Sequence, residues 1–206
     1  MDNLLIRWRA ITDKLNAPKS LVEHGYHDIK KAYSGVNRHY HTLSHLAFMF
    51  AEVDREDIKD DGIEFAIWYH DLVYRAGSAS NERKSADIAS HALTNLGLPQ
   101  NKIIKIKQMI MATKDHVCEP GDKATALFLD IDMSILGAQS TIYQHYSDSI
   151  RKEMFWLPLA LYRKARLDFL RSLEYRDTLF LTEIFQQRYE KQARKNIAEE
   201  QDFLRR

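Results

Sequence analysis

The 206-residue sequence contains only one cysteine, seven glycines and four prolines. Cys118 has no second cysteine with which to pair, so an internal disulfide is excluded and a cytoplasmic protein is expected. So few glycines and prolines cannot supply the many tight turns that an all-β fold requires. The absences therefore favour a helical protein of the cytoplasm.

The sequence also lacks an excess of charge of either sign and lacks a long hydrophobic run. Thirty basic and 29 acidic side chains leave a formal charge of +1, which argues against electrostatic binding of nucleic acid or an anionic membrane. The most apolar stretch, residues 65–74, is about half the length of a membrane span and contains a histidine and an aspartate. The first residues also lack the pattern of a signal peptide. We expect neither a membrane nor a nucleic-acid partner.

Apolar residues are plentiful, and their spacing is helical. They make up 45% of the chain, enough for a core at this length, and they recur at intervals of three and four residues. We therefore predict an all-α fold in one domain, without repeats or linkers. Predicted helices cover approximately residues 4–15, 21–33, 41–53, 63–74, 81–96, 99–113, 122–137 and 177–205, with two more between 141 and 173 that are bent or broken at Pro158.

Residue types that bind metals appear in a suggestive order along these apolar segments. His41 and His45 are four apart, which places both on one face of a helix. The adjacent pair His70-Asp71 follows, and then the segment "LFLDIDMSILG", which carries two aspartates. Charged residues are seldom buried unless they are paired or bind a metal. Mixed nitrogen and oxygen donors suit Mn, Fe, Co, Ni or Zn better than Ca. Neighbours on a helix diverge by about 100°, so the spacing alone does not show that His70 and Asp71 converge.

Five short motifs, "YHTLSH", "WYHD", "NERKSA", "ATKDH" and "DIDMSILG", together resemble the HD superfamily of metal-dependent phosphohydrolases, and in particular a subgroup of uncharacterised bacterial predicted HD phosphohydrolases. The likeness spans about residues 33–137. It implies an all-helical HD-domain bundle with a metal core over that range and a helical extension over about 138–206. The family order of ligands, His … His-Asp … Asp, implies metal binding by His45, His70, Asp71 and Asp132.

The more distant likeness to cyclic-nucleotide phosphodiesterases suggests individual roles. Their opening motif is similar, and its first histidine protonates the leaving oxygen, so the resemblance makes His41 the candidate general acid. Their last aspartate precedes Leu-Ser, and here Asp132 precedes Met133-Ser134, which favours Asp132 over Asp130 as the fourth ligand. The chain lacks their long nucleotide pocket and their His-Pro-Gly, which argues against a cyclic nucleotide as substrate.

Several other side chains are candidates for substrate or second-metal contacts, each with a structural alternative. His116 is a candidate second-metal or phosphate ligand, or else a histidine favoured by a helix end. Asn81 and Glu82 are candidates for substrate contact, or else for helix capping, with Ser80 as the alternative to Asn81 at the cap. Arg38 is a candidate phosphate ligand, or else a surface charge.

A second His-Asp pair, His27-Asp28 in "HGYHDIKK", lies in a charged segment that reads as a surface helix. We interpret this pair as a decoy rather than as the metal pair.

The predicted function is hydrolysis of a phosphomonoester or phosphodiester of a nucleotide or other small metabolite by metal-activated water. The predicted cofactor is one or two divalent ions, Mn, Fe, Co, Ni, Zn or Mg, with Asp71 shared between two ions if both are present. Two alternatives remain at this point, a di-iron HD-fold oxygenase and a non-catalytic sensor of a nucleotide or metal. The sequence leaves a homodimer open.

Overall fold

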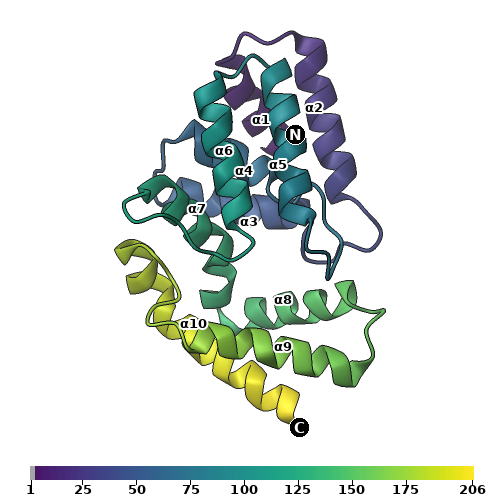
Figure 1. Ribbon diagram of the computed structural model, residues 1–206, viewed down its shortest axis with the longest axis vertical. Coiled ribbons are helices and arrows are strands. Elements are labelled where there is room, and N and C mark those ends of the chain that lie inside the picture. The colour runs from purple at the N-terminus through teal and green to yellow at the C-terminus, as the bar shows by residue number, and fades with distance from the viewer. Residues whose placement is uncertain (1–2) are drawn as a thin grey trace. The chain divides into compact units, whose positions relative to one another are not determined.

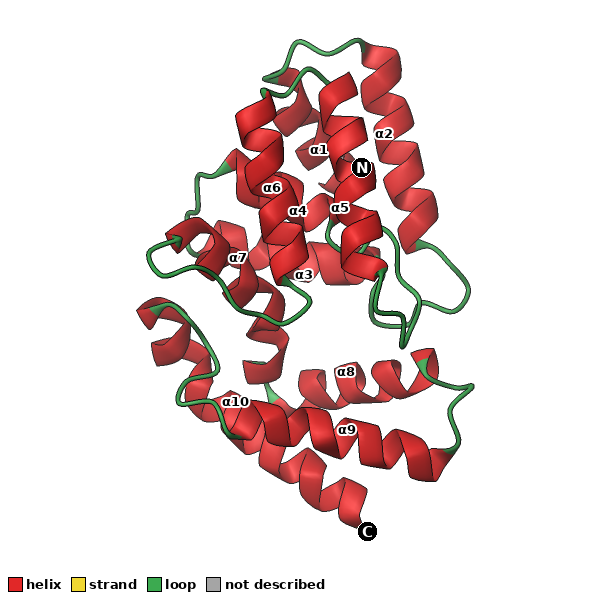
Figure 2. Ribbon diagram, viewed as in Figure 1, coloured by secondary structure: helices red, strands yellow, loops and turns green. Residues whose placement is uncertain are grey.

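The computed structural model describes residues 3–206 and confirms the all-α prediction (Figure 1). The described residues form ten α-helices and one short 3₁₀-helix, and no strand occurs among them (Figure 2). No helix in this described range has the length and apolar character needed to cross a membrane.

The chain divides into two compact units after Phe128. The prediction of one domain whose metal core ends near residue 137 stays a prediction, because the division lies within a helix, α7. The first unit contains α1 (Asn3–Asp13), α2 (Lys19–Tyr33), α3 (Leu43–Arg55), α4 (Asp61–Tyr69), α5 (Asn81–Asn95), α6 (Gln100–Ala112) and the first half of α7 (Lys123–Met133).

Helix α4 lies at the centre of the first unit because it is apolar on nearly every side. Six of its residues are completely or almost completely inaccessible to solvent, and α3, α5 and α6 pack around it. Trp68 meets Trp8 of α1 edge to face, with ring centroids 5.5 Å apart. The N-terminus of α4 is capped by Asp60, whose carboxylate accepts hydrogen bonds from the backbone N–H groups of Gly62 and Ile63.

Two of the predicted helix boundaries that are wrong lie at the candidate site, and both errors affect the functional argument. The helix predicted over 63–74 ends at Tyr69, so His70 and Asp71 lie in the turn that follows α4. The helix predicted to begin near His41 starts at Leu43, with Thr42 as its N-cap, so His41 precedes α3.

The second unit contains the end of α7, the 3₁₀-helix η1 (Ser134–Gly137), α8 (Ser140–Glu153), α9 (Leu159–Glu174) and α10 (Glu183–Arg205). The last helix begins at Glu183 rather than near 177 as predicted. Gly137 packs directly on α10: a Cβ atom at this position would lie 2.5 Å from Cβ of Tyr189. Only glycine allows η1 to approach α10 so closely.

A buried ion pair joins α9 to α10 in the second unit. The guanidinium of Arg166 donates to both carboxylate oxygens of Glu200, at 2.9 and 3.0 Å. Tyr143 and Ser147 of α8 donate to the same carboxylate. Every oxygen of this buried carboxylate is therefore hydrogen-bonded, as a charge removed from water requires.

Candidate metal centre

His45 enters the site from the first turn of α3. The side chain of Thr42 caps this helix by accepting a hydrogen bond from the backbone N–H of Ser44. His45 is only 3% exposed. Its ring nitrogen Nε2 lies 3.2 Å from Nε2 of His70, so the imidazoles of two sequence-distant histidines meet tip to tip.

The turn after α4 brings the side chains of the His-Asp pair together. His70 is the C-cap of α4, and Asp71 already lies outside the helix, so the helical divergence of neighbouring residues does not apply. Nε2 of His70 lies 3.1 Å from Oδ2 of Asp71. The convergence that the spacing left open is therefore present in the structure.

The other nitrogen of the His70 ring determines where its proton lies. Nδ1 is 2.9 Å from the backbone carbonyl oxygen of Ile67, which can only accept a hydrogen bond, so Nδ1 carries the hydrogen. In the neutral ring, Nε2 then presents a lone pair toward the Asp71 oxygen. Two acceptors face each other, and a cation between them removes the repulsion. A hydrogen bond from the second ring nitrogen to a carbonyl is also the usual support of a metal-binding histidine.

Asp132 supplies the third member of a group that could hold a metal ion. Helix α7 begins in the first unit and continues unbroken to Met133, so Asp132 lies on its last turn. One ligand atom each of His45, His70 and Asp132 lies within 4.8 Å of the others. Two of the three side chains are buried, and the donor set of two imidazoles and a carboxylate fits Zn, Mn, Fe, Co or Ni.

Asp130, the alternative fourth ligand, accepts hydrogen bonds from the segment that precedes α10. Its two carboxylate oxygens accept hydrogen bonds from the backbone N–H groups of Leu181 and Thr182, both at 2.7 Å, and from the Thr182 hydroxyl at 2.6 Å. Thr182 is the N-cap of α10, so Asp130 completes the cap of that helix. This use of Asp130 agrees with the preference for Asp132 as the ligand.

His41 lies beside the group rather than in it. Its Nε2 atom is 3.8 Å from Oδ2 of Asp71, and its side chain is 16% exposed. The His41 ring is stacked on Tyr74, with centroids 3.9 Å apart, and meets Tyr40 edge to face. Two aromatic neighbours thus fix the imidazole at the edge of the cluster with a path to solvent.

Arg38 holds the backbone of the site, which sequence reasoning did not foresee. Its guanidinium donates to the carbonyl oxygens of His41, Asp71 and Leu72, at 3.0, 2.8 and 2.8 Å. The same group lies over the ring of Tyr33. Arg38 therefore ties the segment before α3 to the turn after α4, instead of standing free as a surface charge.

Asn81 supports the loop that follows the His-Asp turn. Its amide accepts a hydrogen bond from the backbone N–H of Arg75 and donates to the carbonyl of the same residue. The N-cap of α5 is Ser80, and the side chain of Ser80 makes no capping hydrogen bond. The predicted alternative role of Asn81 as a helix cap is therefore wrong, and Glu82 lies in the first turn of α5.

The remaining candidates are apart from the group. His116 follows α6 in a left-handed backbone conformation (φ 51°) and is not part of the ligand cluster found among residues 3–206. His27 and Asp28 are both exposed on α2, as expected for the decoy pair. Sequence reasoning missed Tyr74, whose only signal is its place three residues after Asp71.

No family model, curated protein or solved structure matches this chain. The site is therefore described by its chemistry alone. His45, His70 and Asp132 form a largely buried group that could hold a metal ion. Asp71 contacts His70, and His41 lies near Asp71.

Proposed function

We propose that the protein is a metal-dependent phosphohydrolase related to the HD superfamily, acting on a phosphate ester of a nucleotide or other small metabolite. The observation that carries the proposal is the 3.1 Å approach of two acceptor atoms, His70 Nε2 and Asp71 Oδ2, beside the His45 ring. A divalent ion could be coordinated by both atoms at once. The order His45, His70-Asp71, Asp132 along the chain is the order that the resemblance implies.

Each side chain has a distinct role in this proposal. His45, His70, Asp71 and Asp132 would hold the ion, and the carbonyl of Ile67 keeps the lone pair of His70 directed at it. A bound divalent ion supplies Lewis acidity toward a phosphoryl oxygen and lowers the pKa of a bound water toward neutrality. The ion would be Mn, Fe, Co, Ni, Zn or Mg, and a second ion would share Asp71.

His41 has the position expected of a proton donor to the leaving group. Its ring lies at the partly exposed edge of the cluster, and stacking on Tyr74 fixes its plane. The Nε2 atom lies 3.8 Å from Oδ2 of Asp71, which places it beside the proposed metal ligands, where a leaving oxygen of the substrate would lie. General acid catalysis of this kind contributes about 10²–10⁴-fold to the rate.

Oxygen activation by a di-iron centre is less well supported. That chemistry needs further histidine ligands, and the group of converging ligand atoms in the described part of the chain contains only His45 and His70 as histidines.

The test combines metal analysis with turnover. Asp71→Asn keeps the size of the side chain but removes the negative charge with which it would bind the metal ion. We expect it to lose bound metal and to lose hydrolysis of p-nitrophenyl phosphate and bis(p-nitrophenyl) phosphate, measured with Mn, Co, Ni, Mg or Fe. Asp28→Asn, the aspartate of the exposed His27-Asp28 pair, is the matched control and should retain both. Loss of metal with unchanged turnover would refute the proposed function.

A further inference from the structure

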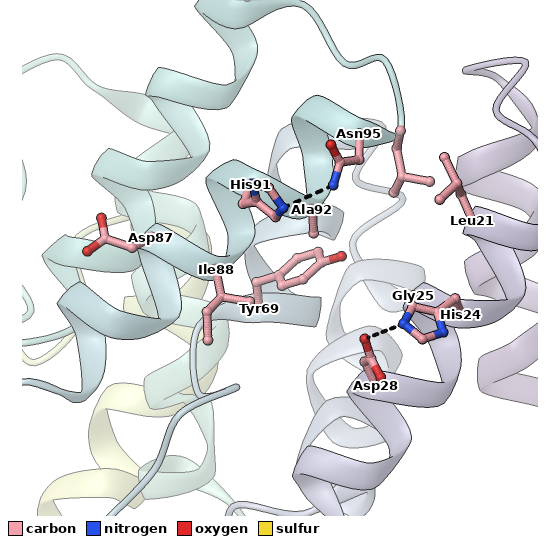
Figure 3. Close-up of a pocket in the computed structure, with 11 residues that line it drawn as sticks. Leu21, His24, Gly25, Asp28, Tyr69, Asp87, Ile88, His91, Ala92 and Asn95 are labelled. Carbon is pink, nitrogen blue, oxygen red and sulfur yellow. Dashed lines mark hydrogen bonds and ion pairs between the residues drawn. The ribbon is translucent and has the colours of Figure 1, made fainter.

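A cavity lies in the first unit among α2, α4 and α5 (Figure 3). It has a volume of about 540 Å³. Leu21 of α2, Ile88 and Ala92 of α5, and Leu96 form most of its apolar wall. A cavity of this volume with largely apolar walls is typical of a site for a small organic molecule.

One buried polar group faces this cavity without a partner among the described residues. Tyr69 is only 2% exposed, and its hydroxyl oxygen has no hydrogen-bond partner within residues 3–206. Figure 3 shows the ring extending from α4 with its hydroxyl end toward the space between α5 and α2. A buried hydroxyl without a partner costs about 1–3 kcal/mol. A ligand group placed in the cavity would remove this cost.

The charges around the cavity favour a cation. Within the described part of the chain, Asp28 and Asp87 line the cavity and no lysine or arginine does. Asp87 is paired with Lys107 at 2.7 Å, whereas the partner of Asp28 among these residues is the His24 imidazole, at 3.4 Å. Burial, and secondarily the charge of Asp28, raises the pKa of Tyr69. The hydroxyl therefore keeps its proton and can both donate and accept.

We propose that this cavity binds a small organic ammonium compound, an amine on an aliphatic or aromatic body. The apolar body lies against Ile88, Ala92 and Leu96, and the ammonium group donates hydrogen bonds to the Tyr69 hydroxyl and the Asp28 carboxylate. This site is separate from the His45–His70 cluster, and the proposal does not depend on the phosphohydrolase activity.

Three matched probes test the proposed chemistry: phenethylamine, the uncharged 2-phenylethanol and the anionic phenylacetate. Titrations of the full-length protein labelled with ¹³C at Ile, Leu and Ala methyl groups would report binding by NMR. We expect saturable shifts of the Ile88, Ala92 and Leu96 methyl signals with phenethylamine, weaker binding of 2-phenylethanol, and no saturable shift with phenylacetate.

Substitutions then locate the ligand. Tyr69→Phe removes one hydrogen bond and Asp28→Asn removes the charge, and each should weaken phenethylamine binding about threefold to tenfold. Ala92→Leu places a larger side chain in the cavity with a good helix former and should abolish binding. Tyr175→Phe, which removes a highly exposed hydroxyl in the second unit, is the control and should bind like the parent protein.

Three results would overturn the proposal. The first is the absence of saturable shifts at these methyl groups with phenethylamine. The second is equal binding of all three probes. The third is phenethylamine binding that is unchanged in both Tyr69→Phe and Ala92→Leu.

Discussion

Nε2 of His70 lies 3.1 Å from Oδ2 of Asp71, while Nδ1 of the same ring is held by the carbonyl of Ile67. Two consecutive residues thus direct their acceptor atoms at one point because the helix that carries them ends one residue earlier. This arrangement leaves room for a cation, and the first prediction follows directly from it.

Divalent ions should stabilise the protein against heat. An ion that binds only the folded state adds about 2.7 kcal/mol at a concentration one hundred times its Kd. For a chain of this length that corresponds to a rise in Tm of about 5–10 °C. Calorimetry of EDTA-treated protein with and without Mn²⁺, Co²⁺ or Ni²⁺ would measure it. His70→Gln should remove the increment, and His27→Gln, in the exposed His-Asp pair, should keep it. An equal increment in both variants would exclude His70 as a ligand.

His41→Gln should separate proton donation from metal binding. A p-nitrophenolate leaving group departs without protonation, whereas an alkoxide requires a proton. We therefore expect the variant to retain its metal and most of its activity on p-nitrophenyl phosphate, but to lose about 10²–10⁴-fold in kcat on an alkyl phosphate ester. Steady-state kinetics on the two esters would measure the difference. An equal loss on both would contradict the role of His41 as a leaving-group acid.

The two aspartates of α7 should give opposite phenotypes. Asp130→Ala leaves the N–H groups of Leu181 and Thr182 without their acceptor, so we expect the free energy of unfolding to fall by about 3 kcal/mol with metal binding retained. Asp132→Ala should lose metal with a smaller change in the stability of the metal-free protein. Urea denaturation in EDTA and metal analysis would distinguish the two. The reverse pattern would make Asp130 the ligand.

The Arg166–Glu200 pair should make stability sensitive to acid. Burial alone would raise the pKa of Glu200, but hydrogen bonds from Arg166, Tyr143 and Ser147 outweigh it and hold the pKa below its ordinary value near 4.5. Because the folded state favours the carboxylate, this contribution is complete above about pH 4.5 and is lost as the pH falls through the folded-state pKa.

Glu200→Gln should therefore lower the free energy of unfolding at neutral pH by about 3–5 kcal/mol, since Arg166 is left buried without its counter-charge. The variant should also lose part of the acid dependence below pH 4.5. Denaturation curves from neutral pH down to acid would measure both effects. Glu199→Gln, in the exposed pair with Lys195 on the same helix, is the control and should change little. A parallel acid profile in Glu200→Gln would contradict the assignment.

The sequence predicted the helices well because their apolar faces repeat at helical spacing. The resemblance to the HD superfamily implied four ligands, His45, His70, Asp71 and Asp132, and ligand atoms of three of them, His45, His70 and Asp132, lie within 4.8 Å of one another. The end of α4 was not predictable. Leu72, Val73 and Tyr74 continue the apolar run without a glycine or proline. The chain nevertheless turns where Arg38, more than thirty residues earlier, donates hydrogen bonds to the carbonyl oxygens of Asp71 and Leu72.

The start of α10 has a similar cause. Residues 177–182 offer no strong break in the helical pattern of the sequence. The helix begins at Glu183, where the Asp130 carboxylate, about fifty residues earlier, accepts hydrogen bonds from the backbone N–H groups of Leu181 and Thr182. Local sequence cannot reveal an acceptor supplied from such a distance. The cavity around Tyr69 escaped prediction for the same reason, because its walls come from three separate helices.

Asp130 and Asp132 are two residues apart on one helix, so their side chains point in nearly opposite directions, about 160° apart around the helix axis. A single residue inserted between Lys123 and Asp130 would rotate both carboxylates by about 100° and withdraw each from its present neighbours at once. A single substitution in α7 can therefore remove the helix cap or the proposed ligand, whereas a change in the length of the helix should remove both together.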